Sequence, residues 1–324
     1  MKAIICTELG GPEKLVFGDV TLPPPAPNEV RIKVAAAGVN FPDTLQIQGK
    51  YQFKATPPFT PGAEVSGVIT AVGSKVATLA VGDRVATLIP IGGYAEEVNA
   101  QAEGVLKLPD DFDLIEAAGF TLVYGTTIHA LKQRGQLKAG ETLLVLGAAG
   151  GVGLSAIQIG KLMGARVIAA ASSAEKLELC RAQGADEVID YSKESLKEAV
   201  KKLTKGQGAD VIYDPVGGDL AQDCFSAINW NGRYLVVGFA AGTIPEIALN
   251  RLLLKGAAAI GVFWGAFIVR EAAVNAENFA QLFAWHGEGR LKPFISKTYP
   301  LADAAQAMLD MQARKVTGKA VLIP

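Results

Sequence analysis

Short segments in which apolar and polar residues alternate dominate the first third of the chain. In Val30–Val34 an apolar side chain occupies every second position, which is the pattern of a half-buried strand. A proline-rich stretch, 23–27, precedes this segment, and short strands interrupted by glycine are predicted at 65–73 and 82–86. Such close spacing of strands predicts a small β-barrel or sandwich.

The pattern changes after about Thr121, where short apolar runs alternate with helical segments. The first of these runs, Leu143–Leu146, leads into a glycine loop and then into a helix that continues through Met163. Apolar strands separated by helices predict βαβ units and a parallel sheet covered on both faces. The further strands are predicted at 166–171, 187–191, 210–213, 234–237 and 258–263.

The end of the chain returns to the earlier pattern. Residues 319–323 are strand-like and could rejoin the first domain. We therefore predict a mixed α/β chain of two domains. Residues 122–265 form a domain with a doubly wound parallel sheet, and residues 1–121 together with 266–324 form a β-rich domain.

The composition is that of a folded globular chain without a charge excess. The 324 residues include 31 Lys+Arg and 32 Asp+Glu, and 50% of them are hydrophobic. Balanced charge gives no electrostatic basis for binding nucleic acid or an anionic membrane surface, so neither partner is expected.

The cysteine spacing and the N-terminal residues indicate in which cellular compartment the protein is expected. Cys6, Cys180 and Cys224 lie far apart, a spacing that provides neither a disulfide framework nor a zinc ribbon and that fits a reducing compartment. An acid, Glu8, occurs before any apolar core of a signal peptide can form. We expect a cytoplasmic protein without a membrane span.

The glycine loop after Leu143–Leu146 has the spacing of a dinucleotide-binding fingerprint. Ala148, Gly150 and Gly153 take its three glycine positions. Gly150 would let the backbone approach a diphosphate, and Gly153 would let the helix approach the strand. The diphosphate would meet N–H groups at the helix N-terminus, where the helix dipole favours negative charge. This strand–loop–helix context predicts a Rossmann domain that binds a nucleotide.

The end of the second strand of this domain indicates which nucleotide is bound. Chains that bind NAD place an acid about 20 residues beyond the loop, where it binds the ribose 2′-hydroxyl. Here no carboxylate ends that strand. Instead Ser172 and Lys176 can donate hydrogen bonds to a 2′-phosphate, Tyr191 could add another, and Glu175 is expected to point away. We predict NADPH as the coenzyme, in preference to NADH.

Four segments together resemble the zinc-free quinone oxidoreductase branch of the medium-chain dehydrogenase/reductase superfamily, over essentially the whole chain. Their order and spacing are more specific than the glycine loop alone. The resemblance implies a GroES-like β-rich catalytic domain that is interrupted in sequence by the Rossmann domain. The segments are 37–44, 61–67, 148–153 and 184–191.

Zinc-dependent relatives hold their metal with thiolate and imidazole ligands. In this chain Asn40 stands where those relatives carry the catalytic cysteine, and Ala63 stands where they carry a histidine, although Glu64 persists. Their four-cysteine lobe is absent. The only histidines, His129 and His286, have no partner at metal-ligand spacing, and His129 is expected to be structural. We expect no metal.

The resemblance also implies the coenzyme contacts. Asn40 and Thr126 would lie near the nicotinamide, while the aromatic side chains of the set could instead pack in the core. The remaining residues are Ala149, Gly150, Gly151 and Val152 at the diphosphate, Ser172, Lys176 and Tyr191 at the adenosine phosphate, and Gly238, Phe239, Ala240, Val262, Phe263 and Trp264 flanking the nicotinamide.

Two residues are candidates for a role in catalysis. Asn40 is one, because its amide interrupts an otherwise apolar strand end. Several relatives carry a tyrosine at the position of Leu45, and leucine cannot donate a hydrogen bond. Tyr51 lies close in sequence and could take over that role. The residues identify no general acid.

The implied activity is an NADPH-dependent, metal-free transfer of reducing equivalents to a quinone, in one- or two-electron steps. A quinone or enone delocalises the arriving charge over its own carbonyl and so needs less help from the protein. Two alternatives stay open: an enone or 2-alkenal double-bond reductase, and a non-catalytic NADPH-binding interaction protein. The nearly uncharged segment 257–262 would be an edge strand, and relatives pair this edge in a homodimer.

Overall fold

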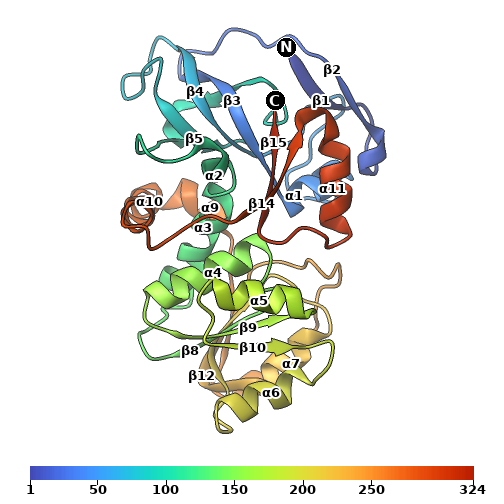
Figure 1. Cartoon of the computed structure of the whole chain (residues 1–324), viewed down its shortest axis with the longest axis vertical. Helices are drawn as coiled ribbons and strands as arrows, with labels where there is room; N and C mark the ends of the chain where they lie inside the picture. The colour runs from blue at the N-terminus through green and yellow to red at the C-terminus, as the bar shows by residue number, and fades with distance from the viewer. The chain divides into compact units, whose positions relative to one another are not determined.

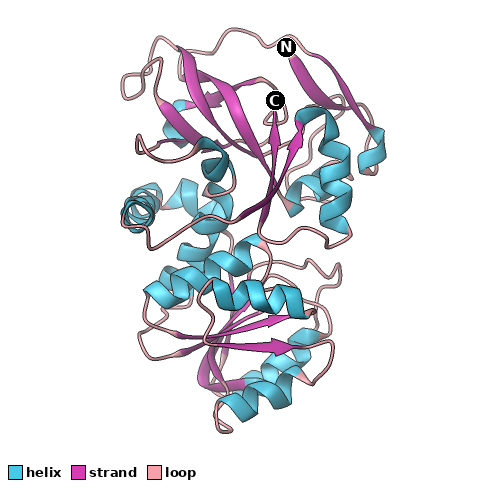
Figure 2. Cartoon of the chain, in the orientation of Figure 1, coloured by secondary structure: helices cyan, strands magenta, loops and turns pink.

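The computed structural model describes every residue of the chain, Met1–Pro324, which divides into two compact units. Unit 1 contains Met1–Leu122 and Pro293–Pro324, and unit 2 contains Val123–Lys292. Unit 2 is therefore inserted into the sequence of unit 1. Figure 2 shows strands as the main component of unit 1 and helices packed around the sheet of unit 2.

The sheet of unit 2 confirms the predicted doubly wound arrangement. Its six strands are all parallel to their neighbours, and chain order reverses between the two central strands, as in a Rossmann fold. In spatial order they are β10 (Glu187–Asp190), β9 (Arg166–Ala171), β8 (Thr142–Val145), β11 (Ala209–Asp214), β12 (Ile228–Val236) and β13 (Ala258–Gly261).

Helices cover both faces of this sheet, so its central strands consist of apolar residues. Leu144, Ile168 and Ile212, one from each of three adjacent strands, have no exposed surface. The helices are α4 (Gly151–Leu162), α5 (Ala174–Ala182), α6 (Leu196–Leu203) and α7 (Leu220–Ala227). Figure 1 shows α4 and α5 on one face of the sheet and α6 and α7 on the opposite face.

Unit 2 continues beyond residue 265, where the sequence analysis ended the Rossmann domain. Asn278 is fully buried and exchanges hydrogen bonds with the amide of Gln133, at 3.0 and 3.2 Å. The indole of Trp264 donates to Asn275 at 3.0 Å. These buried polar pairs attach the last helix to the unit. The elements concerned are α3 (Thr121–Ile128), a π-helical turn (His129–Arg134), α8 (Asn250–Leu253), α9 (Trp264–Arg270) and α10 (Ala272–Gly287).

One strand of unit 2 is longer than predicted. β12 begins at Ile228, whereas the hydrophobic pattern indicated only 234–237. The added part contains Asn231 with a φ of +58°, and the pairing register with β11 shifts across it. Asn and Gly are typical turn residues, so this bulged section gives no strand pattern in the sequence.

Unit 1 is built on a mostly antiparallel sheet of seven strands, with a separate two-stranded ribbon. The strand predicted at 319–323 is present as β15 and pairs with β3. The sheet contains β14 (Ile295–Pro300), β15 (Lys319–Ile323), β3 (Glu29–Val39), β4 (Glu64–Val72), β5 (Arg84–Leu88), β7 (Val105–Lys107) and β6 (Glu97–Gln101), and the ribbon is β1 (Lys2–Cys6) with β2 (Leu15–Asp19).

Three α-helices accompany this sheet. They are α1 (Phe41–Gln46), α2 (Leu114–Ala118) and α11 (Ala304–Gln312), with 3₁₀ turns at 12–14, 102–104 and 301–303. In the whole chain no helix combines the length and the apolar character that a membrane crossing requires.

Candidate functional site

The glycine loop of unit 2 has the geometry that its sequence predicts. It joins β8 to α4, and a side chain added at Gly153 would come within 2.4 Å of the carbonyl oxygen of Gly147. Only glycine therefore allows α4 to pack this closely on the loop. At Gly150, the N-cap of α4, the nearest atom to an added Cβ is 3.4 Å away, which leaves the outer side of the loop open.

The start of α4 offers unpaired donors to a ligand. The first N–H groups of a helix have no partner within it, and Gly151 and Val152 are its first two residues. α4 carries no acid in its first turn. Its N-terminal end therefore suits an anionic group such as a diphosphate.

Three residues predicted to contact the 2′-phosphate gather at the carboxyl ends of β9 and β10. Ser172 follows β9 and is exposed, and the backbone N–H of Tyr191 donates to the carbonyl of Ala171 at 3.2 Å. Lys176 lies half-buried in the first turn of α5, and its N–H donates to the hydroxyl of Ser173 at 3.4 Å. Neighbouring parallel strands thus place these three residues at one edge of the sheet, where Tyr191 packs against the apolar core of unit 2.

Two acids lie near the same edge. Glu175 is exposed in the first turn of α5. Asp190 ends β10, and sequence reasoning did not consider it. Its carboxylate accepts hydrogen bonds from the N–H and the hydroxyl of Ser192, at 3.1 and 2.5 Å, and pairs with Lys193 at 3.3 Å. The hydrogen bond from Ser192 is the main cause of the lowered pKa of Asp190, which is therefore an anion engaged by its own neighbours.

The loops after β11 and β12 are bound to each other. Asp214, the last residue of β11, is buried and accepts from the N–H groups of Val216 and Gly217 at 2.7 and 2.9 Å, and from the hydroxyl of Tyr234. The N–H of Ala240 donates to the carbonyl of Pro215 at 3.0 Å. These bonds fix the backbone of 238–240, the segment expected to flank the nicotinamide.

The three aromatic residues near these strand ends have different surroundings. Trp264 is 6% exposed and packs against Gly125 and Phe279, so its side chain belongs to the core. Phe263 is 59% exposed, and Phe239 is half-buried beside Gly217. The side chain of Trp264 therefore packs in the core, which was the alternative to a coenzyme contact. The side chain of Phe263 is exposed to solvent.

α3 carries both a predicted contact and a structural histidine. Thr126 is half-buried, while its neighbour Thr127 is fully buried and hydrogen-bonded to Ser155 and Tyr213, at 2.7 and 2.9 Å. His129 stacks on an aromatic ring, with 3.9 Å between ring centroids, and burial lowers its pKa to about 4. Neutral and enclosed, His129 is part of the packing of unit 2.

In unit 1, Asn40 lies in a buried polar cluster that sequence reasoning did not anticipate. The ammonium of Lys319 donates to Glu64 at 3.0 Å, to the amide oxygen of Asn40 at 2.5 Å and to the carbonyl of Val39 at 3.2 Å. The amide nitrogen of Asn40 donates to the same carboxylate oxygen of Glu64 at 2.9 Å. Lys319 and Asn40 are each 4% exposed and Glu64 is fully buried.

The second oxygen of Glu64 binds the start of α3. It accepts a hydrogen bond from the N–H of Leu122 at 2.8 Å. An anion near a helix N-terminus is favoured by the unpaired N–H groups and by the helix dipole. The ion pair of Glu64 and Lys319 therefore connects β4, β15, the end of β3 and the beginning of α3 within unit 1.

The carboxyl of Asp43 binds the backbone of Asn40. One oxygen of its carboxyl accepts the backbone N–H of Asn40 at 2.9 Å and the hydroxyl of Tyr94 at 2.8 Å. The other oxygen is buried without a partner, as is the amide oxygen of Gln46 one turn later on α1. Burial raises the pKa of Asp43 to about 6, against the opposing effect of its hydrogen bonds and of Lys319.

Tyr51, the other candidate for catalysis, is half-buried in the same unit. Burial raises its pKa, and the nearby charge of Asp43 raises it further. Leu45, where several relatives carry tyrosine, is half-buried on α1. Asp43 thus binds the backbone of Asn40 and raises the pKa of Tyr51, and the participation of both residues in catalysis stays a prediction.

Lys319 and Asp43, which the sequence analysis did not select, show only weak signals in the sequence. Lys319 opens an apolar strand, where a lysine on a strand buried on both faces is unusual. Asp43 is the third residue of α1 and forms a capping box with Asn40. An Asn-x-x-Asp spacing indicates a helix start, but it does not show that the carboxyl is buried.

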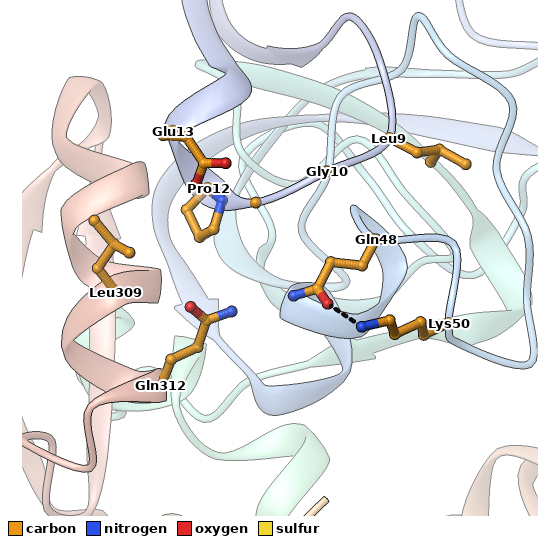
Figure 3. A pocket seen from close by; sticks show the side chains of 9 residues that line it. Leu9, Gly10, Pro12, Glu13, Gln48, Lys50, Leu309 and Gln312 are labelled. Carbon is orange, nitrogen blue, oxygen red and sulfur yellow. Dashed lines mark hydrogen bonds between the residues drawn. The ribbon is translucent and has the colours of Figure 1, made fainter.

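A surface hollow in unit 1 is a poor candidate for the site. It measures about 390 Å³ and is bordered by the loop 9–13, by Gln48 and Lys50 after α1, and by Leu309 and Gln312 of α11 (Figure 3). Its charged side chains are exposed, and the amine of Lys50 is bonded to Gln48 at 2.9 Å. No predicted site residue lines it. Elsewhere, no group of three or more His, Cys, Asp or Glu side chains is arranged to hold a metal ion.

Comparisons with known proteins match both halves of the chain. Residues 26–110 match the family of alcohol dehydrogenase GroES-like domains, and residues 151–283 match the family described as zinc-binding dehydrogenase. A quinone oxidoreductase-like protein 2 of Bos taurus is 40% identical over 322 residues, covering 99% of this chain and 92% of the relative.

Solved structures share the whole fold. The quinone oxidoreductase of Escherichia coli, solved in complex with NADPH, is 30% identical with a TM-score of 0.93 and full coverage of both chains. A 2-haloacrylate reductase is 32% identical with a TM-score of 0.88, covering 100% of this chain and 99% of the other.

The raised pKa of Asp43 gives a prediction for stability. Between about pH 4 and pH 6 the folded chain retains a proton at Asp43 that the unfolded chain releases. The free energy of unfolding therefore falls as the pH rises through this window. Asp43→Asn should abolish this decrease in the free energy of unfolding, which amounts to on the order of 2 kcal/mol between pH 4 and pH 8.

Urea unfolding at several pH values measures the effect. The matched control is Asp303→Asn, at an exposed aspartate of the same unit. An Asp43→Asn protein whose stability declines with pH as steeply as that of the wild type would show that Asp43 is already ionised at low pH.

Proposed function

The chain belongs to the quinone oxidoreductase branch of the medium-chain dehydrogenase/reductase superfamily, and from this membership we propose that it is an NADPH-dependent reductase of quinones. The observation that carries the proposal is the edge of unit 2 at which Ser172, Lys176 and Tyr191 gather beside the glycine loop. Bound NADPH supplies the hydride. The chain supplies the cradle at α4, the contacts for the 2′-phosphate and the orientation of the ring.

Hydroxyl and ammonium donors at this edge favour the phosphorylated coenzyme. Ser172 and Lys176 can both donate to a 2′-phosphate, and no carboxylate stands at the end of β9, where one would repel it. Asp190 is occupied by Ser192 and Lys193. The E. coli relative was solved with NADPH, which supports the same coenzyme for this chain.

We propose that the reduction proceeds without a metal. Asn40 and Ala63 stand where zinc-dependent relatives carry ligands, and both hydrogens of the Asn40 amide are engaged within unit 1. An amide and a methyl group do not provide the thiolate and imidazole that zinc prefers. A quinone needs no Lewis acid because its own carbonyl delocalises the arriving charge.

The principal alternative is reduction of an activated carbon–carbon double bond. The structural similarity to a 2-haloacrylate reductase favours it, since a haloacrylate is an activated alkene. A non-catalytic NADPH-binding role gains support from Leu45, which stands where several relatives carry a tyrosine. Location in the cytoplasm stays a prediction, consistent with three buried free cysteines.

We further propose a homodimer that forms through β13. This strand lies at the edge of the unit 2 sheet, as predicted for 257–262. The segment before it exposes Leu249, Leu253 and Leu254, which are 72–79% accessible, and Phe263 follows it. An uncovered strand edge beside exposed leucines is a typical surface for pairing with a second copy.

The first prediction of this proposal concerns the acceptor. Purified protein should oxidise NADPH in the presence of a benzoquinone or naphthoquinone, and faster than with a 2-alkenal or an enone at equal concentration. NADPH absorbance measures the rate, and a reaction without acceptor is the control. Faster turnover of the alkenal would establish the double-bond reductase, and tight NADPH binding without turnover of any acceptor would establish the non-catalytic role.

A second prediction concerns the coenzyme. Lys176→Ala removes a charge-assisted hydrogen bond to the 2′-phosphate, worth roughly 1.5–3 kcal/mol, so NADPH affinity should fall about ten- to a hundredfold. NADH affinity should change little, because NADH lacks this phosphate. Fluorescence titration with both coenzymes checks the result, with Lys202→Ala on the exposed side of α6 as control. An unchanged NADPH/NADH preference would refute the role of Lys176.

A third prediction concerns assembly. Light scattering should give the mass of a dimer, and Leu253→Glu with Leu254→Glu should shift it toward a monomer, because two carboxylates would have to be buried at the interface. Val269→Glu is a control, since it changes an exposed apolar residue outside β13 and its preceding segment. A monomeric wild-type protein at working concentration would exclude this interface.

A further inference from the structure

Three buried hydroxyl groups form a hydrogen-bonded chain inside unit 2. The hydroxyl of Thr127 on α3 lies 2.9 Å from that of Tyr213 on β11 and 2.7 Å from that of Ser155 on α4. None of the three residues has exposed surface. The hydroxyl of Ser155 lies 3.0 Å from the carbonyl oxygen of Val152, the second residue of α4. The hydroxyls therefore connect β11 and α3 to the start of the helix that follows the glycine loop.

The direction of this chain follows from the partners of each hydroxyl. Burial raises the pKa of Tyr213, which therefore keeps its proton and donates it to Thr127. Thr127 then donates its own hydrogen to Ser155. The hydrogen of Ser155 is directed to the carbonyl of Val152, at 3.0 Å, or to that of Val123, at 3.2 Å. Hydrogen bonds aligned in one direction polarise one another, so the three hydroxyls act together.

The start of α4 is weakly stabilised by its own residues. Its N-cap is Gly150, and Gly151 and Gly153 are two of its first three residues. Glycine loses more conformational freedom in a helix than any other residue, so each one destabilises this turn. No side chain caps α4, whereas Ser173 and Ser195 cap α5 and α6 of the same unit. The first turn of α4 therefore needs support from outside the helix.

We propose that Tyr213, Thr127 and Ser155 are positioning residues, which hold the first turn of α4 where its N–H groups bind the diphosphate of the coenzyme. The chain of hydroxyls ends on a carbonyl, so it occupies none of the N–H groups that the ligand needs. This role rests on the proposed function in taking the glycine loop as the diphosphate site. All of the residues concerned lie in unit 2.

Two ligands separate positioning from a general loss of structure. NADPH carries a diphosphate and a 2′-phosphate, whereas adenosine 2′-monophosphate carries only the latter. Thr127→Val keeps the size of the side chain but interrupts the chain of hydroxyls. NADPH affinity should therefore fall roughly threefold to tenfold, the loss expected for one hydrogen bond, while affinity for adenosine 2′-monophosphate stays unchanged. Titration calorimetry measures both, and an equal loss for the two ligands, or no loss for NADPH, would overturn the proposal.

Thr204→Val is the matched control, because it removes another buried threonine hydroxyl of unit 2. This hydroxyl donates to the carbonyl of Val200 and accepts from the N–H of Gly208, both at 2.8 Å, at the C-terminal end of α6. Thr204→Val should lower the melting temperature without changing NADPH affinity. Thr127→Ser keeps the hydroxyl and should bind NADPH as the wild type does. A loss as large as that in Thr127→Val would show that packing alone matters, contrary to the proposal.

A mutant cycle tests whether the hydroxyls act through one another. Tyr213→Phe removes the first donor of the chain and should also weaken NADPH binding. If Tyr213 acts through Thr127, adding Tyr213→Phe to Thr127→Val should weaken NADPH binding no further. Additive losses would show that the two hydroxyls act independently, and the proposed chain would then be wrong.

Hydrogen exchange provides a measurement without the coenzyme. The N–H of Leu154 donates to the carbonyl of Gly150 at 2.8 Å and closes the first turn of α4. Exchange at Leu154 should be faster in Thr127→Val than in the wild type or in Thr204→Val, because the turn opens more often. Equal exchange in all three proteins would contradict the proposal. A wild-type protein that binds no NADPH would count against the proposed function, whereas exchange at Leu154 would still decide whether the hydroxyls hold this turn.

Discussion

The ion pair of Glu64 and Lys319 is the interaction on which unit 1 depends. Burying two opposite charges costs several kcal/mol for each ion, and attraction offsets this cost only when the remaining hydrogen-bonding groups are also satisfied. Here the ammonium has three acceptors, and the carboxylate has donors on both oxygens, including the N–H of Leu122. The pair is stable in this position because four separate segments converge on it.

This requirement also constrains Asn40. Its side chain lies between the two ions, while its backbone N–H is bound by Asp43. A residue held at so many points keeps one orientation, because rotation of its amide would break hydrogen bonds to both ions. In this cluster an amide and a carboxylate surround an ammonium.

Unit 2 depends on a different physical constraint. The backbone of α4 has to approach the backbone of the glycine loop closely. The contact between Gly153 and the carbonyl of Gly147 leaves no space for a side chain, and it brings the start of α4 against the end of β8. The unpaired N–H groups of α4 then face an open loop. Its chemistry comes from backbone geometry, so the pattern of small residues along the chain is sufficient to reveal it.

The difference between the two units explains what the sequence by itself determined. The parallel sheet, the glycine loop and the donors at Ser172 and Lys176 are consequences of local patterns: apolar runs, glycine spacing and the residues at a strand's end. The cluster around Asn40 is not local, since Glu64 and Lys319 are 255 positions apart in the chain. Sequence alone identified Asn40 as unusual in an apolar setting, but only the tertiary structure decided which charges surround it, because burial and pairing of ions depend on segments that meet through folding.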